Sequence, residues 1–333
     1  MQIIIIKLGA KGDVVRTMPL LLAIKEKYPD SEITWITKQE SLEILKTSPY
    51  INNLLSIPLD SQVYGLPKYD ILYNFDIDDE ATELAKQVNA DKKFGFYSDE
   101  GYASAFNFPA EYYLSTLFDD ELKKSNKKTY QEIMFNAAEL PYNKQHHPIY
   151  LTYLEKQYAE DFITKNNINK EKLIGIHIGA SSRWPSKVWH KENLKEFIKK
   201  ANENYEILLF GGPNETDYHD SLSKELEQEG IKIHRNNPNN SDKEFFALVN
   251  VCNKIISGDS FALHVALALK KPTIGLFFCT PSNEVEDYGL LKKLTSPKLY
   301  DFFPEKCDQY DEDLTKSISA QEVLDALDEI EKD

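Results

Sequence analysis

Residues 1–29, MQIIIIKLGAKGDVVRTMPLLLAIKEKYP, contain the stretch that decides the fold. Four consecutive isoleucines without a 3.6-residue spacing predict a buried β-strand at the start of the chain. A glycine-flanked turn follows, and the periodic stretch behind it predicts a helix over residues 14–28. A strand, a tight turn and a helix in this order are typical of open α/β sheets, which bind ligands at the carboxyl ends of their strands.

This turn carries one carboxylate, Asp13, and two roles stay open for it. Aspartate is a favoured N-cap, so a helix cap is the simpler interpretation of the local sequence. The start of a helix would also keep the carboxylate ionised, as a general base requires. Both roles need Asp13 at the point where the first strand ends.

Composition limits the classes of protein to consider. A chain of 333 residues, 41% of them apolar, is long enough for two domains with sizeable cores. The formal net charge of −15 argues against a nucleic-acid partner, which needs a basic face. We find no transmembrane segment and no secretory leader, and so expect a cytoplasmic protein. The cysteines lack metal-type spacing and are expected to be buried or free thiols: Cys252, Cys279 and Cys307.

Strands and helices alternate through both halves of the chain, which predicts an α/β protein with two doubly wound, Rossmann-like domains. We place the linker in the loop PYNKQHHP (141–148), which gives domains 1–148 and 149–333. Its His146 and His147 are expected to be solvated linker residues rather than metal ligands. The aromatic and polar segment 97–128 is expected to be a mobile insertion.

Four predicted strand ends in the second half carry small or polar residues that suit a nucleotide: HIGASSRWPSKVW (177–189), FGGPNETD (210–217), SGDSFALH (257–264) and FFCTPSN (277–283). Lys187 and the helix opened by Asp259 and Ser260 suit a phosphate. Glu215 suits ribose hydroxyls. Each feature also has a purely structural interpretation. The Gly211-Gly212-Pro213 segment could be only a turn, Asp259 only a helix cap, and His264 a core histidine. The fingerprints of simple dehydrogenases and P-loop NTPases are absent from the sequence.

These segments, in this order, resemble glycosyltransferase family 9, the ADP-heptose:lipopolysaccharide heptosyltransferases. The resemblance covers nearly the whole chain, from KLGAKGDVVRTMPLLLAIKEKYPDSEITWIT and YDILYNFDID to GGPNE and SGDSFALHVALALKKPTIGLF. It implies a GT-B fold, with two Rossmann-like domains facing a central cleft. It also implies inverting, metal-independent transfer of a heptose from an ADP-sugar, without a cofactor, to a hydroxyl of a surface-glycan acceptor such as the lipopolysaccharide inner core.

The resemblance assigns roles to individual residues. Asp13 would be the general base, and Lys11 and Arg16 would contact the acceptor. The donor would be bound by Lys187, Ser181, Gly212, Glu215, Asp259, Ser260 and His264. A glycolipid acceptor would bring the protein into peripheral contact with the inner membrane. The family's Asp-Thr-Gly is Asp259-Ser260-Phe261 here. We therefore expect the base of the nucleotide to be read by the Gly211–Glu215 loop and apolar residues near Leu248, not by Phe261.

Other interpretations remain open at this point. One is a transferase of the same fold with another nucleotide-sugar donor or an acceptor without the acidic sugar Kdo. A sugar-nucleotide 2-epimerase would bind a similar donor without needing an acceptor. A non-catalytic module that binds a nucleotide-sugar would fit the altered Asp259 turn. The acidic run DIDD (76–79) is similar to a metal-binding Asp-x-Asp, but its place before a predicted helix favours capping.

Overall fold

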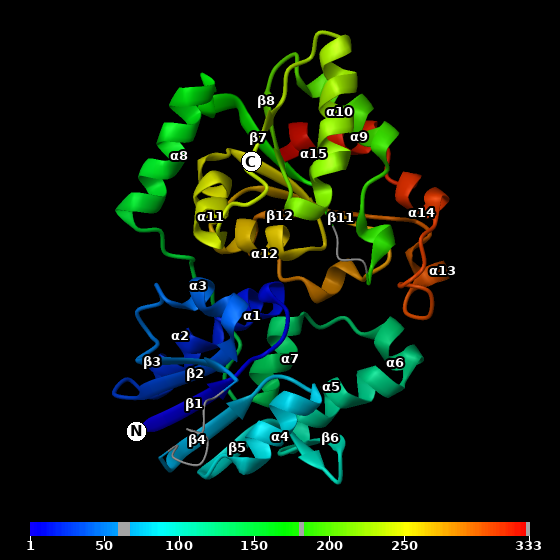
Figure 1. Cartoon of the computed structure of the whole chain (residues 1–333). Coiled ribbons are helices and arrows are strands. Elements are labelled where there is room, and N and C mark those ends of the chain that lie inside the picture. Colours follow the sequence, from blue (N-terminus) through cyan, green and yellow to red (C-terminus); the bar gives the residue numbers. More distant parts are fainter. Residues whose placement is uncertain (59–66, 180–182, 331–333) are drawn as a thin grey trace. The chain divides into compact units, whose positions relative to one another are not determined.

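We describe the protein from a computed structural model, which covers residues 1–58, 67–179 and 183–330. The chain divides into two compact units, each described by itself below. Unit 1 comprises residues 1–150 and 283–286, and unit 2 comprises residues 151–282 and 287–333. In Figure 1, unit 1 is coloured mainly from blue to teal and unit 2 from green to red.

Unit 1 contains a six-stranded sheet in the order β3-β2-β1-β4-β5-β6. Among the described strands of this unit, β5 and β6 pair antiparallel and the other neighbours are parallel. The four isoleucines predicted as a strand are fully buried in β1, between β2 and β4. The strand order reverses at β1, and in such sheets ligands bind at the carboxyl ends of the strands on either side of the reversal. The strands are β1 (Gln2–Ile6), β2 (Glu32–Lys38), β3 (Asn53–Ile57), β4 (Tyr69–Asn74), β5 (Ala90–Asp99) and β6 (Tyr102–Ala105).

The helices of unit 1 differ from the sequence-based expectation in two places. The predicted helix 14–28 is two helices, α1 and α2, because Pro19 has no N–H to continue the first one and instead forms the N-cap of the second. The predicted mobile insertion 97–128 is wrong, since this segment forms β6, α5 and α6. The helices are α1 (Lys11–Thr17), α2 (Leu20–Lys27), α3 (Leu42–Leu45), α4 (Asp79–Gln87), α5 (Phe108–Phe118), α6 (Asp120–Ser125) and α7 (Tyr130–Ala137).

Unit 2 repeats the doubly wound plan with a parallel sheet in the order β12-β11-β10-β7-β8-β9. Here the order reverses between β7 and β10. The strands are β7 (Leu173–His177), β8 (Glu206–Phe210), β9 (His234–Arg235), β10 (Lys254–Gly258), β11 (Thr273–Phe277) and β12 (Leu291–Thr295). The helices are α8 (Tyr153–Asn166), α9 (Lys191–Ala201), α10 (Thr216–Gln228), α11 (Asp242–Val251), α12 (Phe261–Ala268), α13 (Leu299–Phe302), α14 (Glu312–Lys316) and α15 (Ala320–Ile330).

Two features of unit 2 follow directly from its sequence. Helix α12 is buried from Ala262 to Ala268, which fits its apolar residues on all sides. The predicted capping box opens α15, since the Ser319 N–H donates to Glu322 Oε2 over 2.7 Å and the Glu322 N–H to Ser319 Oγ over 3.2 Å. The three cysteines are buried and free, as predicted.

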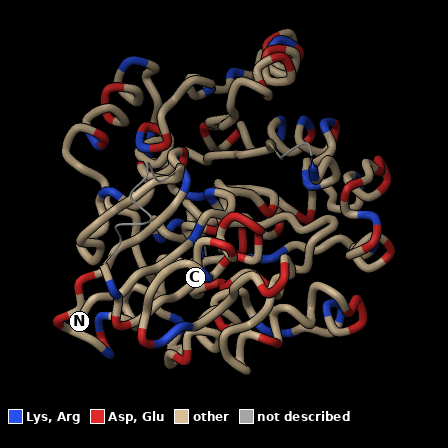
Figure 2. The backbone as a smooth tube through the Cα atoms, turned by 60° about the horizontal axis from the view of Figure 1, so that its bottom comes forward, with Lys and Arg blue, Asp and Glu red and all other residues tan. Residues whose placement is uncertain are grey.

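The surface charges are mixed despite the net charge of −15. Acidic and basic residues are interspersed along the backbone (Figure 2), and several pair, such as Lys195 with Glu229 over 3.1 Å. Among the described residues, no helix combines the length and the apolar character needed to cross a lipid bilayer.

Candidate functional site

In unit 1, the loop between β1 and α1 places Asp13 beyond the carboxyl end of the central strand. Helix α1 begins at Lys11, and Ala10 occupies the N-cap position. Asp13 is therefore in the first turn of the helix rather than at its cap, so the capping interpretation is wrong. Its side chain, 33% exposed, forms an ion pair with Arg16, and 2.7 Å separates Oδ1 from Nη2. This pairing fixes the orientation of an accessible carboxylate.

Arg16 is itself fixed from a second side. Its guanidinium lies over the ring of Tyr130 on α7, 3.8 Å from the ring centroid. The Tyr130 hydroxyl lies 3.2 Å from Thr17 Oγ1, and Thr17 donates to the Asp13 carbonyl over 2.7 Å. The planar guanidinium can stack on the ring and pair with the carboxylate at the same time. Arg16 and Asp13 thus form one ordered group, and Lys11 lies half-buried in the same turn.

A buried ion pair holds this loop, and the sequence analysis did not anticipate it. Lys7, at the end of β1, pairs with Asp76, which follows β4. Asp76 also accepts the N–H of Leu8 and, over 2.9 Å, that of Gly9. Burial lowers the pKa of Lys7, but the charges of Asp76, Tyr130 and Asp13 and the hydrogen bond to Asp76 together outweigh burial and raise it, so the ammonium stays charged. Asp76 therefore holds the β1–α1 loop and does not cap α4, whose N-cap is Asp78.

Gly9 is the point where these charges converge. A Cβ atom there would lie 3.0 Å from Asp76 Oδ1, 3.2 Å from Lys7 Nζ and 3.3 Å from Asp13 Oδ2. The absence of a side chain at Gly9 lets these groups approach the backbone closely. The groups that approach are the protein's own charges.

In unit 2, the corresponding point lies where β7 and β10 end. Lys187 Nζ donates to Asp259 Oδ2 over 2.7 Å, and Thr280 Oγ1 donates to the same oxygen over 2.7 Å. His264 faces the other oxygen, with Nε2 4.0 Å from Oδ1. Burial opposes ionisation of Asp259, but Lys187 and His264, with these hydrogen bonds, hold the pKa of the carboxyl below its usual range. The carboxylate is therefore charged, and it holds Lys187 at the start of α12.

The backbone around Lys187 is anchored by its neighbours. Ser186 donates through Oγ to the Gln309 carbonyl over 2.8 Å, and Trp189 donates through Nε1 to the Ile318 carbonyl over 2.8 Å. A Cβ atom on Gly258 would lie 2.7 Å from the Lys187 carbonyl oxygen. Gly258 thus makes room for the Lys187 segment against the end of β10.

His177 is a further polar residue at this point that the sequence analysis left unassigned. It ends β7, and its Nδ1 lies 3.2 Å from Ser260 Oγ, which in turn lies 3.1 Å from Ser257 Oγ. Desolvation lowers the pKa of His177 to about 4, so the ring is neutral at pH 7. Its position as the last residue of a strand at the reversal was the available indication.

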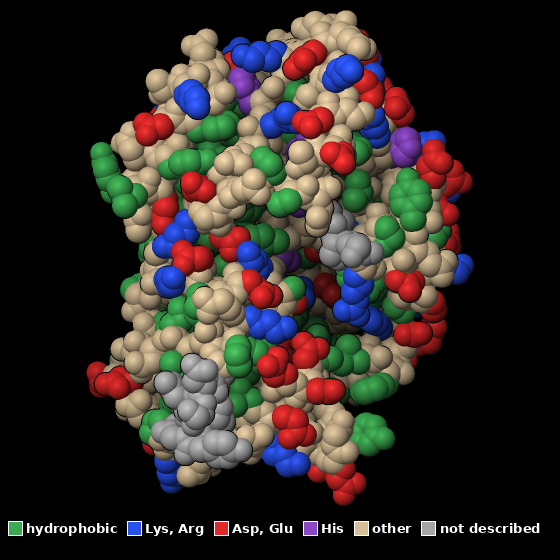
Figure 3. Space-filling view, viewed as in Figure 1, with side chains coloured by type: hydrophobic (Ala, Val, Ile, Leu, Met, Phe, Trp, Pro, Cys, Tyr) green, Lys and Arg blue, Asp and Glu red, His purple; other side chains and the backbone are tan. Residues whose placement is uncertain are grey.

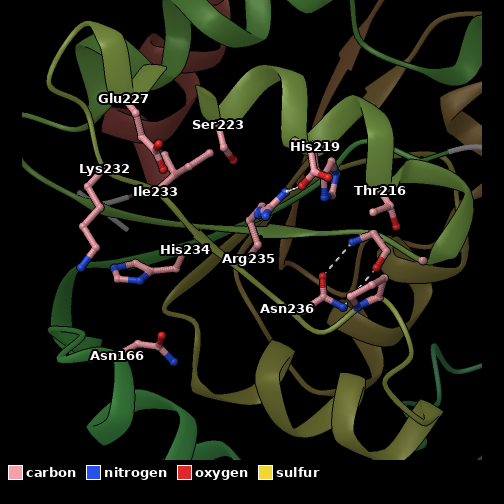
Figure 4. Close-up of a pocket in the computed structure, with 14 residues that line it drawn as sticks. Asn166, Thr216, His219, Ser223, Glu227, Lys232, Ile233, His234, Arg235 and Asn236 are labelled. Atoms are coloured by element: carbon pink, nitrogen blue, oxygen red, sulfur yellow. Dashed lines mark hydrogen bonds and ion pairs between the residues drawn. The ribbon is translucent and has the colours of Figure 1, made fainter. Parts of the chain in front are cut away.

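The glycine-rich turn after β8 brings Glu215 to the same edge of the sheet. Glu215 Oε2 accepts the Gly212 N–H over 2.8 Å, and a Cβ atom on Gly179 would lie 3.0 Å from Glu215 Oε1. The Asn236 side chain fixes the turn through two hydrogen bonds. The Gly211 N–H donates to Asn236 Oδ1 over 3.0 Å, and Asn236 Nδ2 donates to the Gly211 carbonyl over 3.1 Å. The hydrogen bonds of Asn236 to this turn are drawn as dashed lines in Figure 4.

Phe261 takes the position where the resembling family has a glycine. Its ring lies 6.0 Å from that of Phe245 and 5.9 Å from that of Phe246, both on α11. The aromatic side chain is therefore accommodated against α11. Leu248, near which apolar residues are expected to contact the base, is itself fully buried on α11.

Two further expectations concern single residues. Ser181 lies outside the described residues. The expectation that His147 is solvated is wrong, because its side chain is buried. Ser48 Oγ lies 3.1 Å from its Nε2, and the rings of Tyr50 and Tyr150 pack edge-on against it. Among the described residues, no group of three or more His, Cys, Asp and Glu side chains is close enough to hold a metal ion.

The chain is similar to known proteins over most of its length. The model of the family "Glycosyltransferase family 9 (heptosyltransferase)" matches residues 67–300. Lipopolysaccharide heptosyltransferase 1 of Campylobacter coli is 26% identical over 334 residues, covering 90% of this chain and 93% of the relative. A family 9 glycosyltransferase from Veillonella parvula has a similar structure, with a TM-score of 0.78 at 19% identity, covering 99% and 96% of the two chains. The ADP-heptose lipopolysaccharide heptosyltransferase II of E. coli gives a TM-score of 0.72 at 18% identity, covering 99% and 98%.

Two doubly wound units with polar groups at both strand-order reversals have the GT-B fold of these structural neighbours. More closely, the chain belongs to glycosyltransferase family 9, the heptosyltransferase family. The predicted fold class and family are both confirmed.

Proposed function

We propose that this protein transfers a heptose from ADP-heptose to a hydroxyl of the lipopolysaccharide inner core, with inversion and without a metal ion. The observation that carries the proposal is the accessible Asp13 carboxylate, oriented by Arg16 at the strand-order reversal of unit 1. The acceptor class is taken from the relatives, which are named as lipopolysaccharide heptosyltransferases, and the ADP-linked donor from a structural neighbour named as an ADP-heptose lipopolysaccharide heptosyltransferase.

In this mechanism Asp13 accepts the proton of the acceptor hydroxyl. The oxygen then forms a bond to the anomeric carbon of the donor sugar, on the face opposite the nucleotide. The bond between that carbon and the phosphate oxygen breaks, and ADP leaves with the electron pair. A positioned general base contributes roughly 10²–10⁴-fold to such a step.

Unit 2 would stabilise the charge that develops on the leaving ADP. The Lys187 ammonium uses one of its three N–H donors in the hydrogen bond to Asp259, and the other two would donate to a phosphate. Ser260 and the N–H groups at the start of α12 would add donors there, with His264 behind Asp259. The Glu215 carboxylate, which lies next to Gly212, would accept hydrogen bonds from the ribose hydroxyls. Electrostatic stabilisation of this kind is often the largest single contribution to catalysis.

We propose that the reaction needs no metal ion or cofactor, because fixed cations take the role that a metal has in other sugar-nucleotide sites. Support comes from Lys187 in unit 2, a cation held in place by Asp259. Transfer should therefore continue at an unchanged rate in excess EDTA. A rate restored only by added Mg²⁺ or Mn²⁺ would contradict this part.

The acceptor would be a glycolipid, so we propose that the protein is cytoplasmic and works at the inner face of the membrane. Lys11 and Arg16 would contact acidic groups of the acceptor. Aromatic side chains on β6 and α5 are largely exposed: Tyr102, Phe108 and Phe118. Figure 3 shows hydrophobic side chains standing singly among acidic ones on this unit. Flotation with lipid vesicles should recover the protein only when the vesicles contain the glycolipid acceptor.

The test of the whole proposal is an assay with purified acceptor and two donors. We expect transfer from ADP-heptose, with the new glycosidic bond opposite in anomeric configuration to the donor, as read by NMR. ADP should bind at least about tenfold more tightly than UDP, a difference of about 1.4 kcal/mol. Equal or tighter binding of UDP would indicate another donor. Epimerisation of the donor without acceptor would favour a 2-epimerase, and binding without turnover a non-catalytic module.

A further inference from the structure

We propose that unit 2 has a second ligand site, separate from the donor site, that binds a small neutral carbohydrate. It is a cavity of about 320 Å³ between helix α10 and the edge strand β9, called here the edge cavity. Figure 4 shows its lining side chains converging from α10 above and from residues 232–236 below. Ligand sites in proteins occupy roughly 300–1,000 Å³, so a ligand of one or two sugar rings fits this volume.

Two buried polar groups in this cavity lack a protein partner. His219 and Ser223 are 5% and 8% exposed, and neither His219 Nε2 nor Ser223 Oγ has a hydrogen-bond partner among the described residues. They lie four residues apart on α10 and so face the same side of the helix. Leaving such groups unpaired costs about 1–3 kcal/mol each, which a ligand hydroxyl would recover. Burial also lowers the pKa of His219 to about 4, so its ring is neutral and can accept or donate.

The charges around the cavity balance, and this selects the class of ligand. Lys232 and Arg235 are opposed by Asp220 and Glu227, and Arg235 is already paired with Asp220. A phosphate would therefore meet two carboxylates at close range. Hydroxyl groups both donate and accept, so a neutral polyol can satisfy the cations, the carboxylates and the two buried groups together.

One end of the cavity is closed by the glycine-rich turn after β8, which also carries the proposed donor-binding residue Glu215. This end is formed by Gly211 and Gly212, and a Cβ atom on Gly211 would lie 2.5 Å from His219 Cε1. Asn236 fixes this turn by hydrogen bonds in both directions. A sugar bound to His219 would therefore touch this turn at Gly211, whereas the Glu215 carboxylate lies at Gly212 and Gly179. It should bind together with ADP and not compete with it.

The experiment measures sugar binding to the full chain by saturation-transfer NMR, with glucose, mannose, galactose and maltose as probes and inorganic phosphate as the charged comparison. We expect at least one sugar to bind, and its signal to persist at saturating ADP. Ser223→Leu should fill the cavity and weaken sugar binding at least tenfold while leaving the affinity for ADP unchanged. Ser221→Leu is the matched control, because Ser221 is exposed on the same helix and contacts Lys191.

Arg235→Gln provides a second variant should Ser223→Leu fail to fold, because Arg235 is exposed; it should weaken sugar binding at least fivefold. The proposal is overturned if no sugar binds, if ADP displaces the sugar, or if both cavity variants bind it as the parent does. Phosphate binding more tightly than any of the sugars would overturn the assigned class of ligand.

Discussion

At the scale of single residues, Asp13 is the side chain on which the proposed chemistry depends. Asp13→Asn keeps the shape of the side chain but removes its ability to accept a proton. We expect turnover to fall at least about 10²-fold, with the affinity for ADP unchanged, because ADP is bound by unit 2. Asp78→Asn removes an exposed carboxylate from the same unit and should leave turnover unchanged. Near-normal turnover of the Asp13→Asn variant, measured as ADP release, would remove Asp13 from the mechanism.

Lys187 is the corresponding residue for donor binding. Hydrogen bonds to charged groups contribute about 1.5–3 kcal/mol, so Lys187→Ala should weaken ADP binding roughly 10- to 150-fold in calorimetry. The intact donor should lose affinity by a similar factor. Lys191→Ala serves as the control, since Lys191 pairs on the surface of α9 with Glu225. Equal ADP affinities of the Lys187→Ala variant and the parent would place the phosphates elsewhere.

At the scale of elements, the β1–α1 loop depends on the buried Lys7–Asp76 pair. Asp76→Asn leaves the Lys7 ammonium buried without its counter-charge, which costs about 3–5 kcal/mol in unfolding free energy. Turnover should fall as the β1–α1 loop shifts and displaces Asp13 in the first turn of α1, while ADP binding is unaffected. The double variant Lys7→Met, Asp76→Leu should recover much of the stability, measured by urea unfolding, but not the turnover. Recovery of both would show that the pair serves stability alone.

The sequence predicted the elements that are determined by neighbouring residues. It missed features that depend on contacts between residues far apart in the chain. The isoleucine run predicted β1, and the Ser319–Glu322 spacing predicted the start of α15. By contrast, the role of Asp76 depends on a lysine 69 residues away, which no local pattern reveals. Segment 97–128 looked irregular because its aromatic residues pack in pairs such as Tyr97 with Phe106 rather than in a helical period.

The candidate site divides in the same way. The strand-end motifs predicted that Lys187, Glu215, Asp259 and Ser260 lie at one edge of a sheet, because parallel strands end at the same edge. Which of these groups contact each other could not be predicted. The Lys187–Asp259 pair and the Thr280 and His177 contacts depend on the packing of segments that follow three different strands, β7, β10 and β11.

At the scale of the whole molecule, stability should depend on pH through buried histidines such as His147. Burial lowers the pKa of His147 to about 4, against about 6.5 when unfolded. Between these values the unfolded chain binds a proton that the folded chain does not, so stability falls as the pH falls from about 6.5 to 4. From pH 7 to pH 5 this histidine alone should remove about 2 kcal/mol of unfolding free energy.

Two variants separate this effect from packing. His147→Phe keeps a ring between Tyr50 and Tyr150 but cannot titrate, so urea unfolding at pH 5 and pH 7 should show a smaller difference than in the parent. Ser48→Ala removes the hydrogen bond to His147 and keeps the titrating ring, so the pH dependence should persist. An identical pH dependence in the parent and in His147→Phe would assign it to other groups.

The return of residues 283–286 to unit 1 has a consequence for chimaeras between family members. The Asn283 side chain donates to the Asn126 carbonyl over 2.7 Å, and the buried Glu286 pairs with Lys144 over 3.2 Å and accepts the Tyr142 hydroxyl. A hybrid that joins residues 1–150 to the second half of a relative replaces these four residues without replacing what they bind. Grafting 283–286 back into the foreign half should restore the match, so a single crossover point is the wrong unit of exchange for this protein.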